Sequence, residues 1–156
     1  MKLSLAGKKR RMVMRLLIPE LLRNVDWLPT IVGQLPQMNV AQVNCGNGER
    51  CRLWAAGGHR VFGTDHDPAQ IALARASARA AQLEILFDLA SASALPWPER
   101  SMDLCLAPPL PGLGSSWLIC LSELGRVLKP GGLLCLGEGP RLRTFRRHLG
   151  GGITVA

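Results

Sequence analysis

Gly46, Gly48 and Asp65 are the residues whose types and spacing best suggest chemistry. The two glycines separate an apolar run from Glu49–Ala56, which has the composition of a helix. A strand that turns into a helix through glycines leaves free backbone N–H groups and lets a nucleotide-like ligand approach closely. Asp65 ends a second apolar run, Arg60–Asp65, and an acid at that position is well placed to hold a ribose diol. These residues predict a nucleotide-binding βαβ unit.

Short apolar runs alternate with helical patterns through the remainder of the chain. The expected strands cover residues 39–44, 60–65, 83–87, 102–107 and 133–137. The expected helices cover residues 48–56, 69–81 and 115–128. This alternation predicts an α/β fold of the Rossmann-like, doubly wound type, with a mainly parallel sheet and helices on both faces. Ligands of such sheets bind beyond the carboxyl ends of the strands. The expected rim is formed by residues 44–48, 65–67, 88–91 and 107–109.

Several helix ends are marked by residues with a known capping preference. Gly57-Gly58 is suited to end the first helix, because glycine tolerates the left-handed cap conformation. Asp67 is expected to cap the next helix, with Pro68 in its first turn. Lys129 is expected in the last turn of the third helix, which Pro130-Gly131-Gly132 would end before the next strand.

The length of 156 residues fits one domain, and its charge is unevenly distributed. We expect a basic arm and helix over residues 1–35, followed by a ligand-binding body over residues 36–156. The net charge is +8, but ten of the basic residues lie near the two ends, in residues 2–15 and 141–147. Residues 16–140 contain 9 basic and 11 acidic side chains, which argues against a nucleic-acid ligand. We favour solvated arms over contact with a polyanion or a membrane surface.

Apolar runs and cysteines indicate the compartment. No run approaches the roughly 18 apolar residues of a membrane span, and Arg15 interrupts the apolar run that begins at Met12 after several basic residues. The five cysteines form neither a CxxC motif nor a Cys/His cluster, so no metal site is predicted. We interpret them as buried free thiols of a soluble, cytoplasmic protein.

Three later segments distinguish between nucleotide-binding families. They are Ala94–Pro98, Ser101–Leu104 and Glu123–Gly132. With the glycine turn and Asp65, they resemble the class I S-adenosylmethionine-dependent methyltransferases, small-molecule (methyltransferase type 11-like) branch. The resemblance covers residues 38–138, and Arg126–Gly132 is its most specific part. The near-match of residues 46–51 to the dinucleotide-binding fingerprint is weaker, because the later segments do not suit that class.

The resemblance implies a site for S-adenosylmethionine. Gly46 and Gly48 would approach the methionine and ribose portions of the cofactor. Asp65 would bind the ribose hydroxyls, and His66 would lie near the adenine face. Ser91-Ala92 falls where the family has an acid and its neighbour beside the adenine amino group. The remaining two positions are Gln42, where the family has an acid for the cofactor ammonium, and Asn44, where it has its first glycine.

Three of these positions depart from the family pattern. Gln42 and Ser91 replace acids, and Asn44 replaces a glycine. Asparagine tolerates positive φ better than most residues, so we expect the turn to survive. Glutamine and serine still offer acceptors but lose charge-assisted hydrogen bonds. Asp88 could take the role of Ser91 if the loop is shifted.

The predicted function is S-adenosylmethionine-dependent methyl transfer to an unidentified small molecule. The alternative is a catalytically decayed cofactor-binding or regulatory protein of the same fold. No catalytic residue is assigned, because the sulfonium of the cofactor is already activated and the protein need only align and desolvate the reactants.

The end of the chain is short for this family. Residues 140–156 have room for a short helix and one strand at Ile153–Val155, where the family has a two-stranded hairpin. We expect part of that hairpin to be lacking, as in a trimmed domain, a fragment, or a sheet completed by a partner protein or a second copy.

Overall fold

The computed structural model describes residues 33, 35–107, 116–137, 143–147 and 153–155. The elements in chain order are β1 (Asn39–Val43), α4 (Glu49–Ala56), β2 (Arg60–Asp65), α5 (Pro68–Ala80), β3 (Ile85–Leu89), β4 (Met102–Ala107), α6 (Ser116–Val127), β5 (Leu128–Leu136), β6 (Arg143–Arg147) and β7 (Ile153–Val155). The expected arm and helix at residues 1–35 lie almost entirely outside the described residues. No helix in the described part of the chain is long and apolar enough to cross a bilayer.

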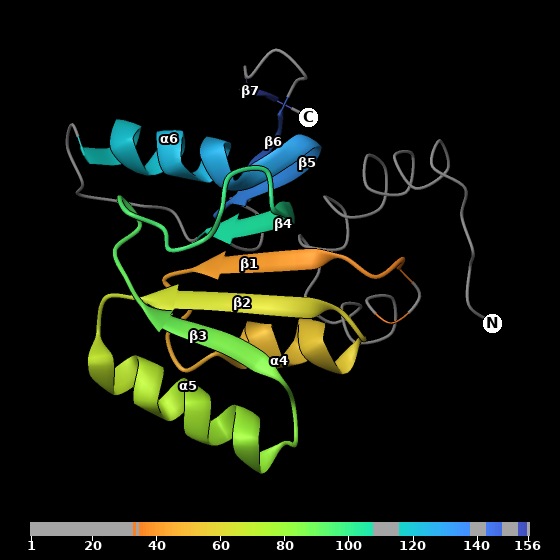
Figure 1. Cartoon of the computed structure of the whole chain (residues 1–156), viewed down its shortest axis with the longest axis vertical. Helices are drawn as coiled ribbons and strands as arrows, with labels where there is room; N and C mark the ends of the chain where they lie inside the picture. The colour runs from red at the N-terminus through yellow and green to blue at the C-terminus, as the bar shows by residue number, and fades with distance from the viewer. Residues whose placement is uncertain (1–32, 34, 108–115, 138–142, 148–152, 156) are drawn as a thin grey trace.

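One seven-stranded sheet organises the molecule, in the order β3-β2-β1-β4-β5-β6-β7 (Figure 1). The five strands from β3 to β5 are parallel, whereas β6 is antiparallel to β5 and β7 is antiparallel to β6. The strand order reverses between β1 and β4, where a doubly wound sheet opens a crevice at the carboxyl ends of its strands. The Rossmann-like, mainly parallel sheet predicted from the sequence is confirmed.

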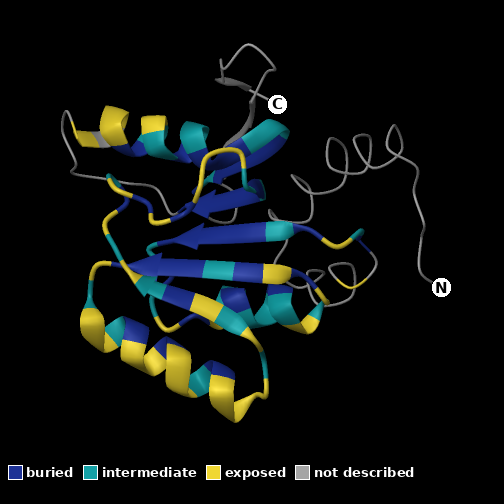
Figure 2. Cartoon of the chain, in the orientation of Figure 1, coloured by how far each residue is buried: buried dark blue, intermediate teal, exposed yellow. Residues whose placement is uncertain are grey.

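Helices cover both faces of the sheet, as the continuous apolar strands predict. Cys51 and Trp54 of α4 and Ile71 of α5 are buried against Val40 and Leu104 on one face. On the other face, α6 buries Cys120, Leu124 and Val127 against Ala41, Val43 and Leu134. Figure 2 shows β1 and β4 as the most uniformly buried strands, with exposed residues on the outer sides of α5 and α6. The central strands therefore contribute side chains to two hydrophobic cores, one on each face of the sheet.

The predicted caps of α4 and α5 are present. Gly57 follows the last residue of α4, and Gly58 adopts a φ of 88°. The Asp67 carboxylate accepts a hydrogen bond of 2.8 Å from the backbone N–H of Ala69, and Pro68 opens α5. These local contacts satisfy backbone groups that a helix end leaves unpaired.

The third strand begins later than the predicted range of 83–87. β3 covers Ile85–Leu89, because Val61 pairs with Ile85 and Asp65 pairs with Leu89. The backbone N–H of Leu83 instead donates to the Ala78 carbonyl at the end of α5. Consequently Asp88 lies inside the strand, on the face opposite Phe87, and the rim loop begins at Ala90.

The Lys-Pro-Gly-Gly segment does not end the helix, and the placement of Lys129 in the last helical turn was wrong. α6 ends at Val127, and residues 129–132 belong to the first half of β5. The pairing of β4 with β5 shifts register between Met102 and Leu104, and Gly131 has a φ of 80°. Lys129 donates to the Asp103 carboxylate at 2.9 Å, so a contact between two strands fixes this lysine. The segment is an irregularity in a strand.

The hairpin after β5 is present in a shortened form. β7 occupies Ile153–Val155, where a strand was expected, and contains only three residues. Arg143–Arg147 forms β6, where room for a short helix was expected. The long apolar strand β5 offers a pairing edge that β6 occupies from Leu133 to Leu136.

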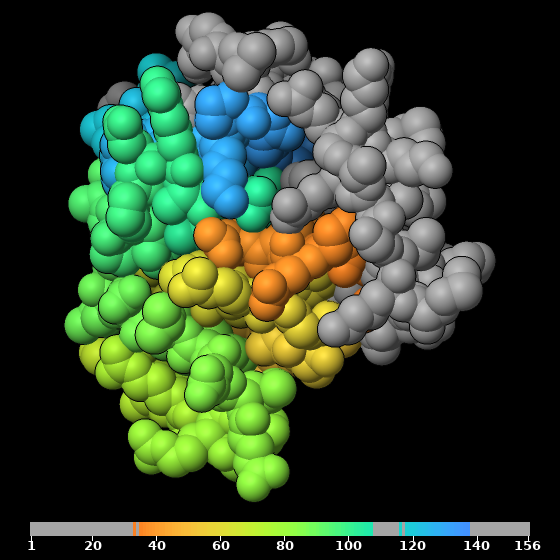
Figure 3. All heavy atoms as spheres, turned by 45° about the vertical axis from the view of Figure 1, so that its right-hand side comes forward, coloured from red at the N-terminus to blue at the C-terminus, as the bar shows by residue number. Residues whose placement is uncertain are grey.

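Figure 3 turns the molecule toward the amino-terminal ends of the strands. On this side, the orange of β1 and of the residues before it lies between the yellow of β2 and the blue of β5. The carboxyl ends of the strands, where the rim is expected, lie at the left of Figure 1.

Candidate functional site

The carboxylate of Asp65 links the ends of β1 and β2. Its Oδ2 accepts a hydrogen bond of 2.8 Å from the backbone N–H of Gly46, and its Oδ1 accepts one of 3.0 Å from the backbone N–H of Asp67. Asp65 is only 5% exposed. The backbone N–H of Cys45 also donates to the Thr64 carbonyl at 2.8 Å. The glycine turn and the acid therefore form one unit, as expected from the order of parallel strands.

The turn after β1 contains three residues with left-handed backbone conformation. Asn44, Gly46 and Gly48 have φ values of 50°, 54° and 73°. The expectation that asparagine would maintain the turn at position 44 is confirmed. The side chain of Asn47 accepts from the backbone N–H of Glu49 at 3.1 Å at the start of α4.

The two glycines of the turn serve different purposes. A Cβ at Gly48 would lie 2.8 Å from Cζ of Phe87 and 3.0 Å from Cβ of Ala74, so the protein itself occupies this space. A Cβ at Gly46 would meet only the Gln70 side chain, at 3.8 Å. Gly46 is thus the position where the backbone is open to a close ligand, whereas Gly48 is required by packing.

The loop after β3 begins beside Asp65. The backbone N–H of Ala90 donates to the Asp65 carbonyl at 3.0 Å, which brings Ser91 and Ala92 to the same rim. Ser91 is exposed, and its hydroxyl lies 2.8 Å from that of Ser93, whereas Ala92 is 8% exposed. His66 projects outward, with a 76% exposed side chain whose Nδ1 lies 3.5 Å from Oδ1 of Asp65. The rim therefore contains Asp65, His66, Ser91 and Ala92 together.

Gln42 is directed toward α4. Its Oε1 lies 3.8 Å from Sγ of Cys51, and Gln42 is 7% exposed. The Cys51 thiol also hydrogen-bonds Cys45, which lowers the pKa of Cys45, while that contact and burial raise the pKa of Cys51. All five cysteines are free and buried, as expected. Gln42 therefore lies in a small thiol–amide network beneath the turn.

Thr64 and Trp97 each have a buried polar atom on the face of the sheet that the loop after β3 covers. Within the described residues, the Thr64 hydroxyl and the indole N–H groups of Trp54 and Trp97 are buried and make no hydrogen bond, and Trp54 lies in the core on the α4 face of the sheet. Thr64 shares a strand face with Phe62, whose ring packs edge-on against Trp97 at 6.4 Å. A buried donor or acceptor is costly when it has no partner. The open backbone at Gly46 and the Asp65 carboxylate fit a nucleoside cofactor.

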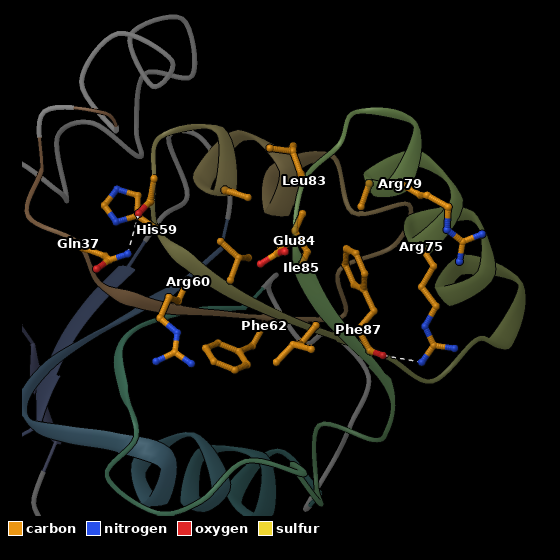
Figure 4. A pocket seen from close by; sticks show the side chains of 15 residues that line it. Gln37, His59, Arg60, Phe62, Arg75, Arg79, Leu83, Glu84, Ile85 and Phe87 are labelled. Carbon is orange, nitrogen blue, oxygen red and sulfur yellow. Dashed lines mark hydrogen bonds between the residues drawn. The ribbon is translucent and has the colours of Figure 1, made fainter.

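A cavity of about 890 Å³ lies away from this rim (Figure 4). It borders the first halves of β2 and β3 and includes His59, Arg60 and Arg79. The Arg75 guanidinium donates to the Phe87 carbonyl at 2.6 Å beside it. His59 is a structural residue, because its Nδ1 accepts from the backbone N–H of Met38 and its ring packs on Trp54. The cavity is not formed by the predicted site residues.

Comparison with known proteins assigns the class. A family model described as a methyltransferase domain matches residues 40–132. The chain therefore belongs to the class I S-adenosylmethionine-dependent methyltransferases, as the sequence motifs indicate, and S-adenosylmethionine is the cofactor of that class.

Individual relatives agree with this assignment. The malonyl-[acyl-carrier protein] O-methyltransferase of Serratia marcescens is 31% identical over 99 residues, which cover 64% of this chain and 37% of that protein. The demethylmenaquinone methyltransferase of Thermus thermophilus is 39% identical over 85 residues, which cover 54% and 39% of the two chains. A solved S-adenosylmethionine-dependent methyltransferase from Methanosarcina mazei has a TM-score of 0.61 and 27% identity, covering 69% of this chain and 56% of that structure. The matched region thus spans less than half the length of these two curated relatives.

Sequence reasoning missed the side chains that hold the loop after β3. Glu123 and Arg126 were noticed only as part of a family motif, yet both bind backbone groups of residues 95–97. Their spacing of three positions on a helix was the available signal, because such residues lie on the same helix face.

Proposed function

We propose that this chain binds S-adenosylmethionine along the carboxyl ends of β1, β2 and β3 and transfers its methyl group to a small-molecule acceptor. The observation that supports this most directly is the buried Asp65 carboxylate beside the open backbone of Gly46. The matched relatives are named for different acceptors, so the family supports a methyl acceptor without specifying which one.

Each rim residue has a proposed role. Asp65 accepts hydrogen bonds from the ribose hydroxyls through the lone pairs that its two backbone contacts leave available. Gly46 and Gly48 form the turn along which the methionine and ribose portions lie, and Asn44 maintains that turn. His66 and Ala92 border the adenine, with Ser91 beside its amino group. Gln42 lies nearest the cofactor ammonium.

The chemistry places few demands on these residues. When bound, S-adenosylmethionine would supply an activated methyl group: the methyl carbon would bond to an acceptor nucleophile, and the S–CH3 bond would break to leave S-adenosylhomocysteine. The protein's contribution is to hold the two reactants in line and to exclude water. A site without a pair of acid–base side chains is compatible with that task.

The decisive experiment has two parts. Calorimetric titration with S-adenosylmethionine and S-adenosylhomocysteine measures binding, and transfer of a radiolabelled methyl group to candidate acceptors measures activity. Binding together with transfer supports the proposal. Absence of binding to either ligand contradicts it.

A second candidate is a binding or regulatory protein that no longer transfers methyl groups. It is favoured by the buried side chain of Gln42, which contacts the Cys51 thiol, and by that of Ser91, whose hydroxyl lies against the Ser93 hydroxyl at the surface. Binding without transfer to any acceptor would support this candidate.

Cellular location and association are further parts of the proposal. Five free thiols suit the reducing cytoplasm. The short strand β7 lies at one edge of the sheet, and such an edge can pair with a second copy or a partner protein. Sedimentation of the purified chain tests self-association.

A further inference from the structure

Residues 90–101 connect β3 to β4 without any helix or strand, and we call them the crossover segment. Because β2 and β1 lie between β3 and β4 in the sheet, the segment must cross both strands. Figure 1 shows it, in green, passing from the end of β3 toward α6. Ala92, Leu95 and Trp97 of this segment are buried in the same core cluster as α6. An irregular segment in a core needs partners for its backbone polar groups.

Glu123 and Arg126 of α6 supply those partners. The Glu123 carboxylate accepts from the backbone N–H of Leu95 at 2.8 Å. The Arg126 guanidinium donates to the carbonyls of Leu95 and Trp97, both at 2.9 Å. The two side chains also bind each other in a forked arrangement, with two N–O distances of 2.7 Å. We call this pair the clamp.

The clamp is an ion pair set into a partly buried position. The Arg126 and Glu123 side chains are 35% and 20% exposed. The hydrogen bond from Arg126 lowers the pKa of Glu123, and the same contact raises the pKa of Arg126. A planar guanidinium can bind a carboxylate and two carbonyls at once, which the point charge of a lysine cannot reproduce.

The clamp fixes one end of a short piece of rim. At the other end, the backbone N–H of Ala90 is bound to the Asp65 carbonyl. Between these anchors lie Ser91 and Ala92, and the backbone N–H of Ala94 closes a turn onto the Ser91 carbonyl at 3.0 Å. The position of Ser91 and Ala92 relative to Asp65 therefore depends on both anchors.

We propose that Glu123 and Arg126 are positioning residues for the adenine side of the cofactor site. They contact no predicted site residue, and they act by holding the crossover segment at Leu95 and Trp97. This inference rests on the proposed binding of S-adenosylmethionine at the rim.

The test measures selectivity for the base. S-adenosylhomocysteine and S-inosylhomocysteine, in which oxygen replaces the adenine amino group, are titrated calorimetrically into wild type and three variants. The variants are Arg126→Ala, Glu123→Gln and the control Lys129→Ala. The control removes an ion pair of similar length, Lys129 to Asp103, at the amino-terminal ends of the strands. Thermal unfolding of each variant is recorded in parallel.

We expect Arg126→Ala to bind the adenosyl ligand about fivefold more weakly, as for the loss of one neutral hydrogen bond at the site. Binding of the inosyl ligand should change little, so the ratio of the two affinities falls. Glu123→Gln should lower the ratio less, because its amide oxygen still accepts from Leu95. Lys129→Ala should keep the wild-type ratio.

If the clamp only stabilises the fold, Arg126→Ala should lower the affinities for both ligands by the same factor and leave their ratio at the wild-type value. An unchanged ratio in Arg126→Ala would therefore overturn the proposal. If Arg126→Ala does not fold, the ratio measured for Glu123→Gln decides. Wild type that binds neither ligand would contradict the proposed function and this inference together. Wild type that prefers adenine, with variants that keep the preference, would contradict this inference alone.

Discussion

The backbone N–H of Gly46 and the carboxylate of Asp65 are joined by a hydrogen bond of 2.8 Å, although 19 positions separate them in the chain. This contact ties the turn after β1 to the end of β2. It uses one lone pair of Oδ2 and holds the carboxylate against an open backbone position. A ligand that binds one of the two residues must therefore lie close to the other.

Replacing Asp65 should reduce cofactor affinity more than replacing a distant acid. Hydrogen bonds to charged groups contribute roughly 1.5–3 kcal/mol each, so Asp65→Ala should weaken binding of S-adenosylhomocysteine at least tenfold. Glu84→Ala is the control, because Glu84 is exposed and lies just before β3. Calorimetry measures both affinities, and equal values for the two variants would contradict the site.

Gly46→Ala and Gly48→Ala should separate ligand binding from stability. Both positions have positive φ, which costs an alanine roughly 1–2 kcal/mol. At Gly48 the added methyl also meets Phe87 and Ala74, and such overpacking costs about 1–3 kcal/mol more.

We therefore expect Gly48→Ala to unfold at clearly lower urea concentration than Gly46→Ala. Gly46→Ala should retain most of its stability and lose affinity for S-adenosylhomocysteine, because its methyl group occupies the open side of the turn. Equal urea midpoints for the two variants would show that contact of the added methyl group with Phe87 and Ala74 does not destabilise Gly48→Ala.

The clamp should make stability depend on pH in the acid range. The Glu123 pKa is lowered in the folded state by Arg126, from an ordinary value of 4.5. A lowered folded-state pKa gives stability that is fully present above pH 4.5 and is lost as the pH falls through the folded value. The difference in melting temperature between wild type and Glu123→Gln should therefore be largest near neutral pH and shrink below pH 4.5. A difference that stays constant from pH 7 to pH 3 would exclude this ionisation.

Restoring the family residues at positions 44 and 91 should tighten cofactor binding. Asn44→Gly removes a side chain from a residue with a φ of 50°, and Ser91→Asp supplies an ionised acceptor where the proposed site has the adenine amino group. The expected gain is about 1–3 kcal/mol in total, measured by calorimetry.

The control is Asn44→Gly with Ser93→Asp, which adds the same charge two residues further along the loop. If both double variants bind alike, the charge at position 91 does not contact the cofactor. Asp88 then becomes the candidate, because it pairs in register with Thr64 on the face that contains the buried Thr64 hydroxyl.

Local patterns in the sequence were sufficient to predict the order of the helices and strands and the part of the rim formed by the ends of β1 and β2. β2 lies at Arg60–Asp65 as predicted, and the cap formed by Asp67 and Pro68 starts α5. These features depend on residues close in the chain, whose periodicity and capping preferences act independently of the remaining fold. The meeting of Gly46 with Asp65 also followed, because adjacent parallel strands end at the same edge of a sheet.

Contacts between distant segments were decided only by the tertiary structure. The register between β2 and β3 moved the third strand to Ile85–Leu89, and the ion pair with Asp103 placed Lys129 in a strand. The clamp joins Arg126 to backbone groups 29 and 31 positions earlier. No periodic pattern encodes such pairings, because they depend on which helix face packs over which loop. The sequence alone therefore determined the class of fold and which strand ends meet at its rim, and packing decided how the loop beside that rim is held.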